Sequence, residues 1–216
     1  MFVGHIALAY AAKRVRPDIS LGWYYAAVAA LDLIWPVFLL LGIEQVDLTT
    51  RGTIFTPVVF TSYPWSHSLV MSLMWGILLA GLARAFGTTR GAAPLLVGLV
   101  VSHWFLDFVS HAPDMPIWPG GETYGLGLWN HVRATYAIEG AMWIAGIATY
   151  LTVRRPVGWQ GWLAFVSFVL ISTALWVPGP SSPPPPSVPM LGLFALIGGW
   201  ILIPWIAWGD RKTRAA

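Results

Sequence analysis

The 216-residue sequence contains no cysteine and only 10% charged residues. The absence of cysteine excludes disulfides, thiolate zinc sites and a cysteine nucleophile, so any metal ligands must be histidines or carboxylates. Soluble domains carry about 25% charged residues, and disordered chains combine low hydrophobicity with high net charge. Because 57% of the residues are hydrophobic, the composition predicts a protein embedded in a lipid bilayer.

Apolar runs of about 20 residues, the length that crosses a bilayer, occur six times and predict an all-α polytopic membrane helix bundle. The runs are Leu21–Ile43, Ser66–Phe86, Ala92–His111, Tyr136–Val153, Trp159–Val177 and Val188–Trp208. Residues 1–12 precede a basic cluster, whereas a signal peptide has its basic residues first, so we expect a short N-terminal half-helix of the mature fold. The chain is predicted to form one integral membrane domain, 1–216. It consists of a metal-site core, 1–153, and a C-terminal helical hairpin, 154–216, with a proline-rich loop at 178–189.

Lysine and arginine residues are divided unequally between the two sides of the predicted bundle. One side has only Arg51 and Arg133. The other has ten: Lys13, Arg14, Arg16, Arg84, Arg90, Arg154, Arg155, Arg211, Lys212 and Arg214. Basic residues mark the cytoplasmic side, so we expect both ends of the six-span core in the cytoplasm and the long connections outside, as in a bacterial inner membrane protein. The net charge of +3 is then a topology signal, and no nucleic acid partner is predicted.

Ionisable residues inside the predicted spans point to function, because each costs at least about 2.5 kcal/mol at the bilayer centre. His103, Asp107 and His111 are spaced i, i+4 and i+8, which places them on one stripe of a helix, about 80° wide. The other such residues are expected at the same depth, toward the outer side; they are His5, Asp32, His67 and Glu139.

Histidine and carboxylate ligands suit Zn²⁺, with Mn²⁺ or Fe²⁺ as alternatives, and a carboxylate can bridge two ions in a site that cleaves phosphoesters. In such a site Asp32 or Glu139 would take or steer a proton, and Arg133 or Arg51 would orient a phosphate oxygen. The loop 112–135, rich in Gly and Pro, is positioned to act as a lid. The sequence therefore favours a hydrolytic metal centre.

Other interpretations of the same residues remain open at this stage. His103 with Asp107 is also the pattern of a structural ion pair or a proton relay, as in a metal-ion or proton transporter. Glu139 also suits the positive end of its own helix. Asp114 is as typical of a turn as of a ligand, and His131 is expected to be no ligand. A structural membrane protein without catalysis is the remaining alternative.

Several short motifs resemble one known family. They are Gly4-His5, Leu31-Asp32, Ser66-His67-Ser68 and the segment 102–107, Ser-His-Trp-Phe-Leu-Asp. Over residues 1–119 their order and spacing resemble the bacterial family of membrane-bound, metal-dependent hydrolases. The segments 111–116 and 125–130 resemble a subgroup of it. The order of ligands is also similar to that of secreted zinc-dependent phospholipase C and related nucleases, which use three zinc ions.

The resemblance to phospholipase C implies an assignment of ligands to ions. It places His5 near one metal and His111 with Glu139 on another. The remaining ion takes Asp32, His67, His103 and Asp107, with Asp107 bridging. The chain departs from the family patterns at Ile34-Trp35, at 61–64 and at Thr135, so we expect two zinc ions, with three as the alternative. The implied substrate is a lipid or lipid-linked phosphoester at the outer side of the membrane.

Overall fold

The computed structural model describes all of residues 1–216 and is mostly helical, as predicted. Its helices are α1 (Val3–Val15), α2 (Leu21–Val28), α3 (Ala30–Leu40), α4 (Pro64–His67), α5 (Leu69–Ala85), α6 (Ala93–Ser110), α7 (Val132–Leu151), α8 (Gly158–Trp176) and α9 (Val188–Arg211). Short 3₁₀ turns are η1 (Arg90–Ala92), η2 (Leu128–Asn130) and η3 (Gly179–Ser181). Three antiparallel strand pairs in the connections were not predicted. They are β1 (Gln45–Asp47) with β2 (Val59–Ser62), β3 (Met115–Pro116) with β4 (Thr123–Tyr124), and β5 (Arg154–Pro156) with β6 (Thr213–Ala215).

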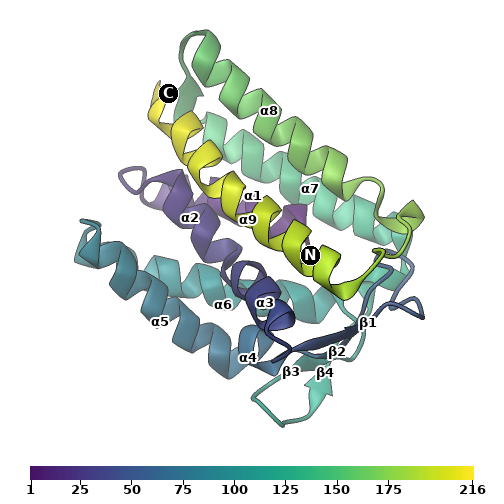
Figure 1. Ribbon diagram of the computed structural model, residues 1–216. Helices are drawn as coiled ribbons and strands as arrows, with labels where there is room; N and C mark the ends of the chain where they lie inside the picture. The colour runs from purple at the N-terminus through teal and green to yellow at the C-terminus, as the bar shows by residue number, and fades with distance from the viewer.

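The helices pack around α1, the short N-terminal helix. Figure 1 shows α5 and α6 side by side on one flank and α7 and α8 on the other, with α9 and the pair α2 and α3 crossing in front. Nine of the 13 residues of α1 are buried, and its neighbours include α7, α2 and α6. The polar side chains of His5 and Lys13 on α1 are therefore placed in the interior of the molecule.

Three helical segments are long and apolar enough to cross a membrane, namely 90–110, α8 and α9. A fourth span results if α2 and α3, which are bent by 55° with respect to each other, count as one. The prediction of six spans is therefore not supported. Helix α5 has only 17 residues, and α7 carries Arg133 and Glu139 among its 20 residues, which lowers its hydropathy.

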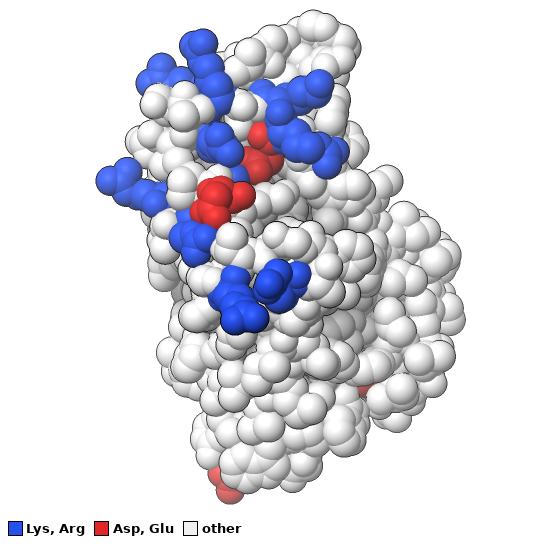
Figure 2. Space-filling view, turned by 90° about the vertical axis from the view of Figure 1, so that its left-hand side faces the viewer, with Lys and Arg blue, Asp and Glu red and all other residues white.

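Lysine and arginine side chains gather toward one end of the molecule (Figure 2). Figure 2 shows most of the lysines and arginines gathered over one end of this face, while the remainder is nearly free of charge. Contacts at this end join distant parts of the chain. Arg16 donates to Thr89 Oγ1 (2.8 Å), Arg154 donates to the Pro17 carbonyl (3.2 Å), and β5 pairs with β6. The predicted site residue on α1, His5, lies in its first turn, at the other end of this helix from Lys13.

Candidate metal centre

The predicted site residues lie at helix ends and breaks away from the basic end. They are His5 near the start of α1, Asp32 in the first turn of α3, His67 at the end of α4, His103 and Asp107 in the C-terminal half of α6, and His111 directly after its last residue. Local sequence explains the breaks. Pro64 begins α4, and the Ser68 hydroxyl accepts a hydrogen bond from the Met71 N–H (3.3 Å) to cap α5. The chain therefore changes direction immediately after His67.

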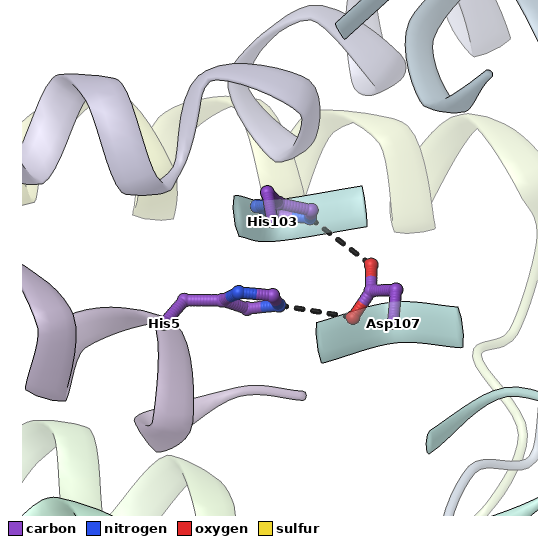
Figure 3. Close-up of side chains that lie close together, drawn as sticks. All are labelled: His5, His103 and Asp107. Carbon is purple, nitrogen blue, oxygen red and sulfur yellow. Dashed lines mark hydrogen bonds and ion pairs between the residues drawn. The ribbon is translucent and has the colours of Figure 1, made fainter. Parts of the chain in front are cut away.

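One group of side chains joins α1 to α6. Figure 3 shows His5 and His103 both directed toward Asp107. The distance from His5 Nε2 to Asp107 Oδ1 is 2.9 Å, and that from His103 Nε2 to Asp107 Oδ2 is 3.1 Å. The two imidazole rings stack, with centres 3.8 Å apart and planes 7° from parallel. A single buried carboxylate is therefore shared by histidines from two helices.

A second group adds residues from α3 and α4 to the same His103. Asp32 Oδ1 lies 3.4 Å from His67 Nε2, and Asp32 Oδ2 lies 3.7 Å from His103 Nε2. In each group the nitrogen and oxygen atoms all lie within 4.8 Å of one another. The two histidines are buried, whereas the Asp32 side chain is 52% exposed. His103 Nε2 thus faces carboxylate oxygens from two different helices.

The protonation of His103 follows from its other ring nitrogen. Nδ1 lies 2.6 Å from the backbone carbonyl of Val28, at the bend between α2 and α3. A carbonyl only accepts, so Nδ1 carries the hydrogen and Nε2 of the neutral ring has a lone pair. That lone pair faces Asp107 and Asp32, which are also acceptors, and Nε2 is buried without a hydrogen-bond partner. The arrangement is repulsive unless a cation or a proton lies between these atoms.

His67 is oriented by a chain of hydrogen bonds that ends at Glu44. Its Nδ1 lies 2.7 Å from the Ser66 hydroxyl, which is itself 2.7 Å from Glu44 Oε2. Two backbone N–H groups, of Trp65 and Ser66, donate to Glu44 Oε1 at 2.8 and 2.7 Å. Burial raises the pKa of Glu44, and these hydrogen bonds oppose the shift. With the Ser66 hydroxyl donating to the carboxylate, its oxygen accepts from His67 Nδ1–H, which leaves the lone pair of His67 on Nε2.

His111 is oriented in the same way by Asp114. Its Nδ1 lies 3.1 Å from Asp114 Oδ1, to which the Tyr63 hydroxyl also donates (2.6 Å). Burial and the adjacent Asp114 raise the pKa of Tyr63 well above its ordinary value, so the phenol remains a donor. Nδ1–H of His111 therefore donates to Asp114, and His111 Nε2 faces Asp107 Oδ2 at 3.9 Å.

Three histidines thus share one orientation, with Nδ1 donating outward and Nε2 directed at carboxylates. Metal-binding histidines characteristically donate their second ring N–H to a carbonyl or carboxylate, which fixes the tautomer. Neutral imidazole nitrogens and carboxylate oxygens are also the donor set that Zn²⁺ takes in a protein without cysteine. The group of Asp32, His67 and His103 therefore fits a divalent cation, and Asp107 belongs to the neighbouring group with His5 and the same His103.

His5 is held differently from the other three histidines. Its Nε2 is close enough to donate to Asp107, while its Nδ1 is buried without a partner. The backbone nitrogen of Met1 contacts the same Asp107 oxygen and lies 2.9 Å from the Ser110 hydroxyl. His5 and Met1 therefore place two further nitrogen groups around Asp107.

Glu139 does not belong to either group of potential ligands. Its Oε2 accepts from the N–H groups of Phe2 (2.8 Å) and Gly4 (3.5 Å), and its Oε1 accepts from Trp129 Nε1 (3.1 Å). Glu139 therefore anchors the first turn of α1, and these bonds account for its burial. The structure does not pair it with His111 as the resemblance implied.

The two arginines predicted to orient a phosphate differ in their surroundings. Arg51 donates to three backbone carbonyls, those of Thr53, Ile54 and Pro180. Arg133 is exposed in the first turn of α7. His131 is likewise exposed and precedes α7. Arg51 is thus engaged by backbone carbonyls, whereas Arg133 is exposed to the surroundings.

The loop 112–135 covers the C-terminal end of α6. The N–H groups of Leu126 and Gly127 donate to the carbonyls of Phe108 (2.8 Å) and His111 (2.7 Å). The Trp129 ring lies 4.7 Å from the His111 ring, centre to centre. At Gly125 a β-carbon would lie 2.0 Å from the Ala112 carbonyl oxygen, so only glycine permits this close approach. The loop is therefore in the position expected of a lid.

Sequence reasoning missed the residues that orient the ligands. Ser66 belongs to the motif 66–68, but no role could be assigned to it from the sequence. Glu44, 22 residues earlier, was not recognised, because its contact with Ser66 depends on the path of the loop between them. No protein-family model, curated protein or solved structure matches the chain. Membership of the hydrolase family accordingly stays a prediction.

Proposed function

We propose that this chain is an integral membrane, metal-dependent hydrolase that cleaves a phosphoester of a lipid or lipid-linked substrate. The observation that carries the proposal is that His103 Nε2, a hydrogen-bond acceptor, faces carboxylate oxygens, which are also acceptors. A buried lone pair, fixed by the Val28 carbonyl, faces carboxylates from α3 and α6. Such a group is stable when a cation lies at its centre, and ionisable residues at membrane depth mark function by default.

In this proposal one zinc ion would be held by His103, His67 and Asp32. A neutral Nε2 has one lone pair, so His103 would bind one ion although it belongs to both groups. A second ion would be held by Asp107 and His111, whose Nε2 is 3.9 Å from Asp107. A third ion on Glu139 has no support in the contacts of that residue.

When bound, such an ion acts as a Lewis acid and lowers the pKa of a coordinated water toward about 7. The residues of the chain supply orientation and proton handling. Asp32 is the exposed acid of the group and is placed to accept a proton, while Arg133 is the arginine free to bind a phosphate oxygen. Glu139, the other predicted acid, positions α1 and with it His5.

The membrane assignment rests on the three candidate spans. With the basic end in the cytoplasm, the site would lie toward the outer side of a bacterial inner membrane, within reach of lipid headgroups. Transport would require a polar path from the site to the basic end. The interior between them is formed by an apolar cluster of 27 buried residues, which favours hydrolysis over transport.

Metal analysis of the purified protein tests the proposal. We expect stoichiometric zinc in the wild type, none in His103→Ala, and unchanged zinc in His131→Ala, which makes the same substitution at an exposed histidine. Hydrolysis of bis(4-nitrophenyl) phosphate should follow the zinc content and stop with a chelator. Absence of zinc from the wild type after reconstitution overturns the proposal.

A further inference from the structure

A cavity of about 350 Å³ extends from the candidate metal centre to the faces of α8 and α9. Ligand pockets range from about 300 to 1,000 Å³. One end is formed by His5 and Asp32, and the remaining lining comes from α1, α2, α3, α8 and α9. Both α8 and α9 are candidate spans. The cavity therefore connects the metal centre with the part of the molecule that faces lipid.

The lining of this cavity is mostly apolar. His5, Asp32 and Tyr25 are its ionisable side chains, and the others are apolar, aromatic or glycine. Asp32 is also the one residue of the metal groups that is exposed. A half-exposed carboxylate at the end of an apolar cavity is costly in a membrane unless a polar or charged group meets it. The cavity thus suits a molecule with a hydrocarbon chain and a polar end.

A second, smaller cavity reaches the metal centre from the outer loops. It has a volume of about 160 Å³ and is lined by His111, Asp114, Trp129, three threonine and glycine residues of the segment 52–56, and their neighbours. Asp107 lies between the two cavities, because it contacts His5 on one side and faces His111 on the other. The cluster is therefore reached by an apolar route from one side and by a polar route from the other.

We propose that the site binds a single-chain amphiphile with a phosphate head, whose hydrocarbon chain occupies the larger cavity along Gly198 and Gly199 of α9. The phosphate meets the metal centre, and the more polar part of the headgroup extends into the smaller cavity. This inference rests on the proposed function and names its substrate class. Charge complementarity supports it, since the apolar route ends where a bound cation would attract an anionic head.

Gly198 provides a way to block the cavity without disturbing the metal centre. A β-carbon at this position meets nothing within 4 Å, whereas at Gly199 it lies 3.0 Å from Leu33. In Gly198→Leu the new side chain therefore extends into open space. Gly98 on α6 offers a matched control, because its β-carbon also meets nothing within 4 Å and it does not line the cavity.

The test is binding of hexadecyl phosphate and of ethyl phosphate to the zinc-loaded protein, measured by native mass spectrometry. We expect wild type and Gly98→Leu to bind hexadecyl phosphate equally. Gly198→Leu should bind it about tenfold more weakly, because displaced methylene groups lose their burial. Binding of ethyl phosphate should be the same in all three proteins. Equal binding of hexadecyl phosphate by both leucine variants overturns the proposal.

Two further measurements separate this inference from the proposed function. Zinc content and hydrolysis of bis(4-nitrophenyl) phosphate, which has no hydrocarbon chain, are measured in the wild type and are expected to be unchanged in Gly98→Leu, which lies outside the cavity lining. If zinc and hydrolysis are present but hexadecyl phosphate binds no better than ethyl phosphate, the chain cavity is wrong and the hydrolase stands. If the wild type lacks zinc, yet hexadecyl phosphate binds more tightly than ethyl phosphate and Gly198→Leu loses this preference, the hydrolase is wrong and the cavity stands.

Discussion

The molecule contains two buried charged clusters, one near each end of α1, and they differ in whether a side chain supplies the cation. At the basic end the Lys13 ammonium, fully buried, donates to Asp210 Oδ2 (2.8 Å) and to the Ile19 (2.8 Å) and Pro17 (3.2 Å) carbonyls. Asp210 in turn accepts from the Leu21 N–H (2.9 Å). This cluster is satisfied by protein groups alone, as a structural ion pair must be.

The cluster at the other end has the acids but no side-chain cation of its own. Asp32 and Asp107 face histidines whose Nδ1 hydrogens donate elsewhere, so their Nε2 atoms present lone pairs to the carboxylates. Apart from the half-exposed Asp32, the charged groups of both clusters are buried, and the difference lies in the count of donors and acceptors. The comparison teaches that a buried acid by itself does not predict a metal ion, whereas an excess of fixed acceptors does.

The largest expected effect is at the satisfied cluster. Lys13→Met leaves Asp210 buried without its cation, which should lower the free energy of unfolding by about 3–5 kcal/mol. Denaturant or thermal unfolding in detergent measures this loss. The exposed neighbour Arg14 provides the control, because Arg14→Met should change stability little. Adding Asp210→Asn to Lys13→Met should recover part of the loss, and no recovery would contradict the ion-pair interpretation.

The next effect concerns the cluster without a cation. Zinc at about 100 times its dissociation constant should raise the free energy of unfolding of the wild type by about 2.7 kcal/mol, since it binds the folded state only. His131→Ala should respond like the wild type, and His103→Ala should not respond. An equal response of His103→Ala would mean that zinc acts elsewhere on the protein.

A smaller effect is expected at the hydrogen-bond chain behind His67. Glu44→Gln replaces the charged acceptor of the Ser66 hydroxyl and should weaken zinc binding about 10–100-fold, the usual range for partners of metal-binding histidines. Competition with a chromophoric chelator gives the affinity. Glu122→Gln, the same change at an exposed acid, is the control. Unchanged zinc affinity in Glu44→Gln would mean that the hydrogen-bond chain does not contribute to metal binding.

The sequence could predict the features that follow the period of a helix or the length of an apolar run. His103, Asp107 and His111 are one and two helical turns apart on α6, and a helix fixes their common face whatever packs against it. The helices themselves and the common depth of His5 and His67 follow in the same way from apolar runs and charge. The number of spans was overestimated, because an apolar run in the sequence does not show that α5 has only 17 residues.

Contacts that depend on loops or on a second helix could not be predicted. The bend at Ala29 places the Val28 carbonyl against His103, and nothing in the sequence indicates which carbonyl becomes the partner. Glu44 reaches Ser66 only because the chain between them returns through the pair β1 and β2. The short strands escaped prediction because two to four residues give no reliable periodicity.

The smallest expected effect is at Glu139. Its substitution shows whether this buried acid resembles the satisfied cluster of Lys13 and Asp210 or belongs to the cluster that lacks a side-chain cation. Its bonds to the N–H groups of Phe2 and Gly4 and to Trp129 satisfy it with protein donors, as in the Lys13 and Asp210 cluster. Glu139→Gln keeps an acceptor of the same shape but loses the charge. Hydrogen bonds to charged groups contribute about 1 kcal/mol more than neutral ones, so stability should fall by about that amount while zinc content stays at the wild-type level.

Glu139→Ala, which removes the acceptor, should cost more stability at the same zinc content. Loss of zinc from Glu139→Gln would instead place this acid among the ligands, as the order of residues in the sequence suggested, and would return the third ion to consideration.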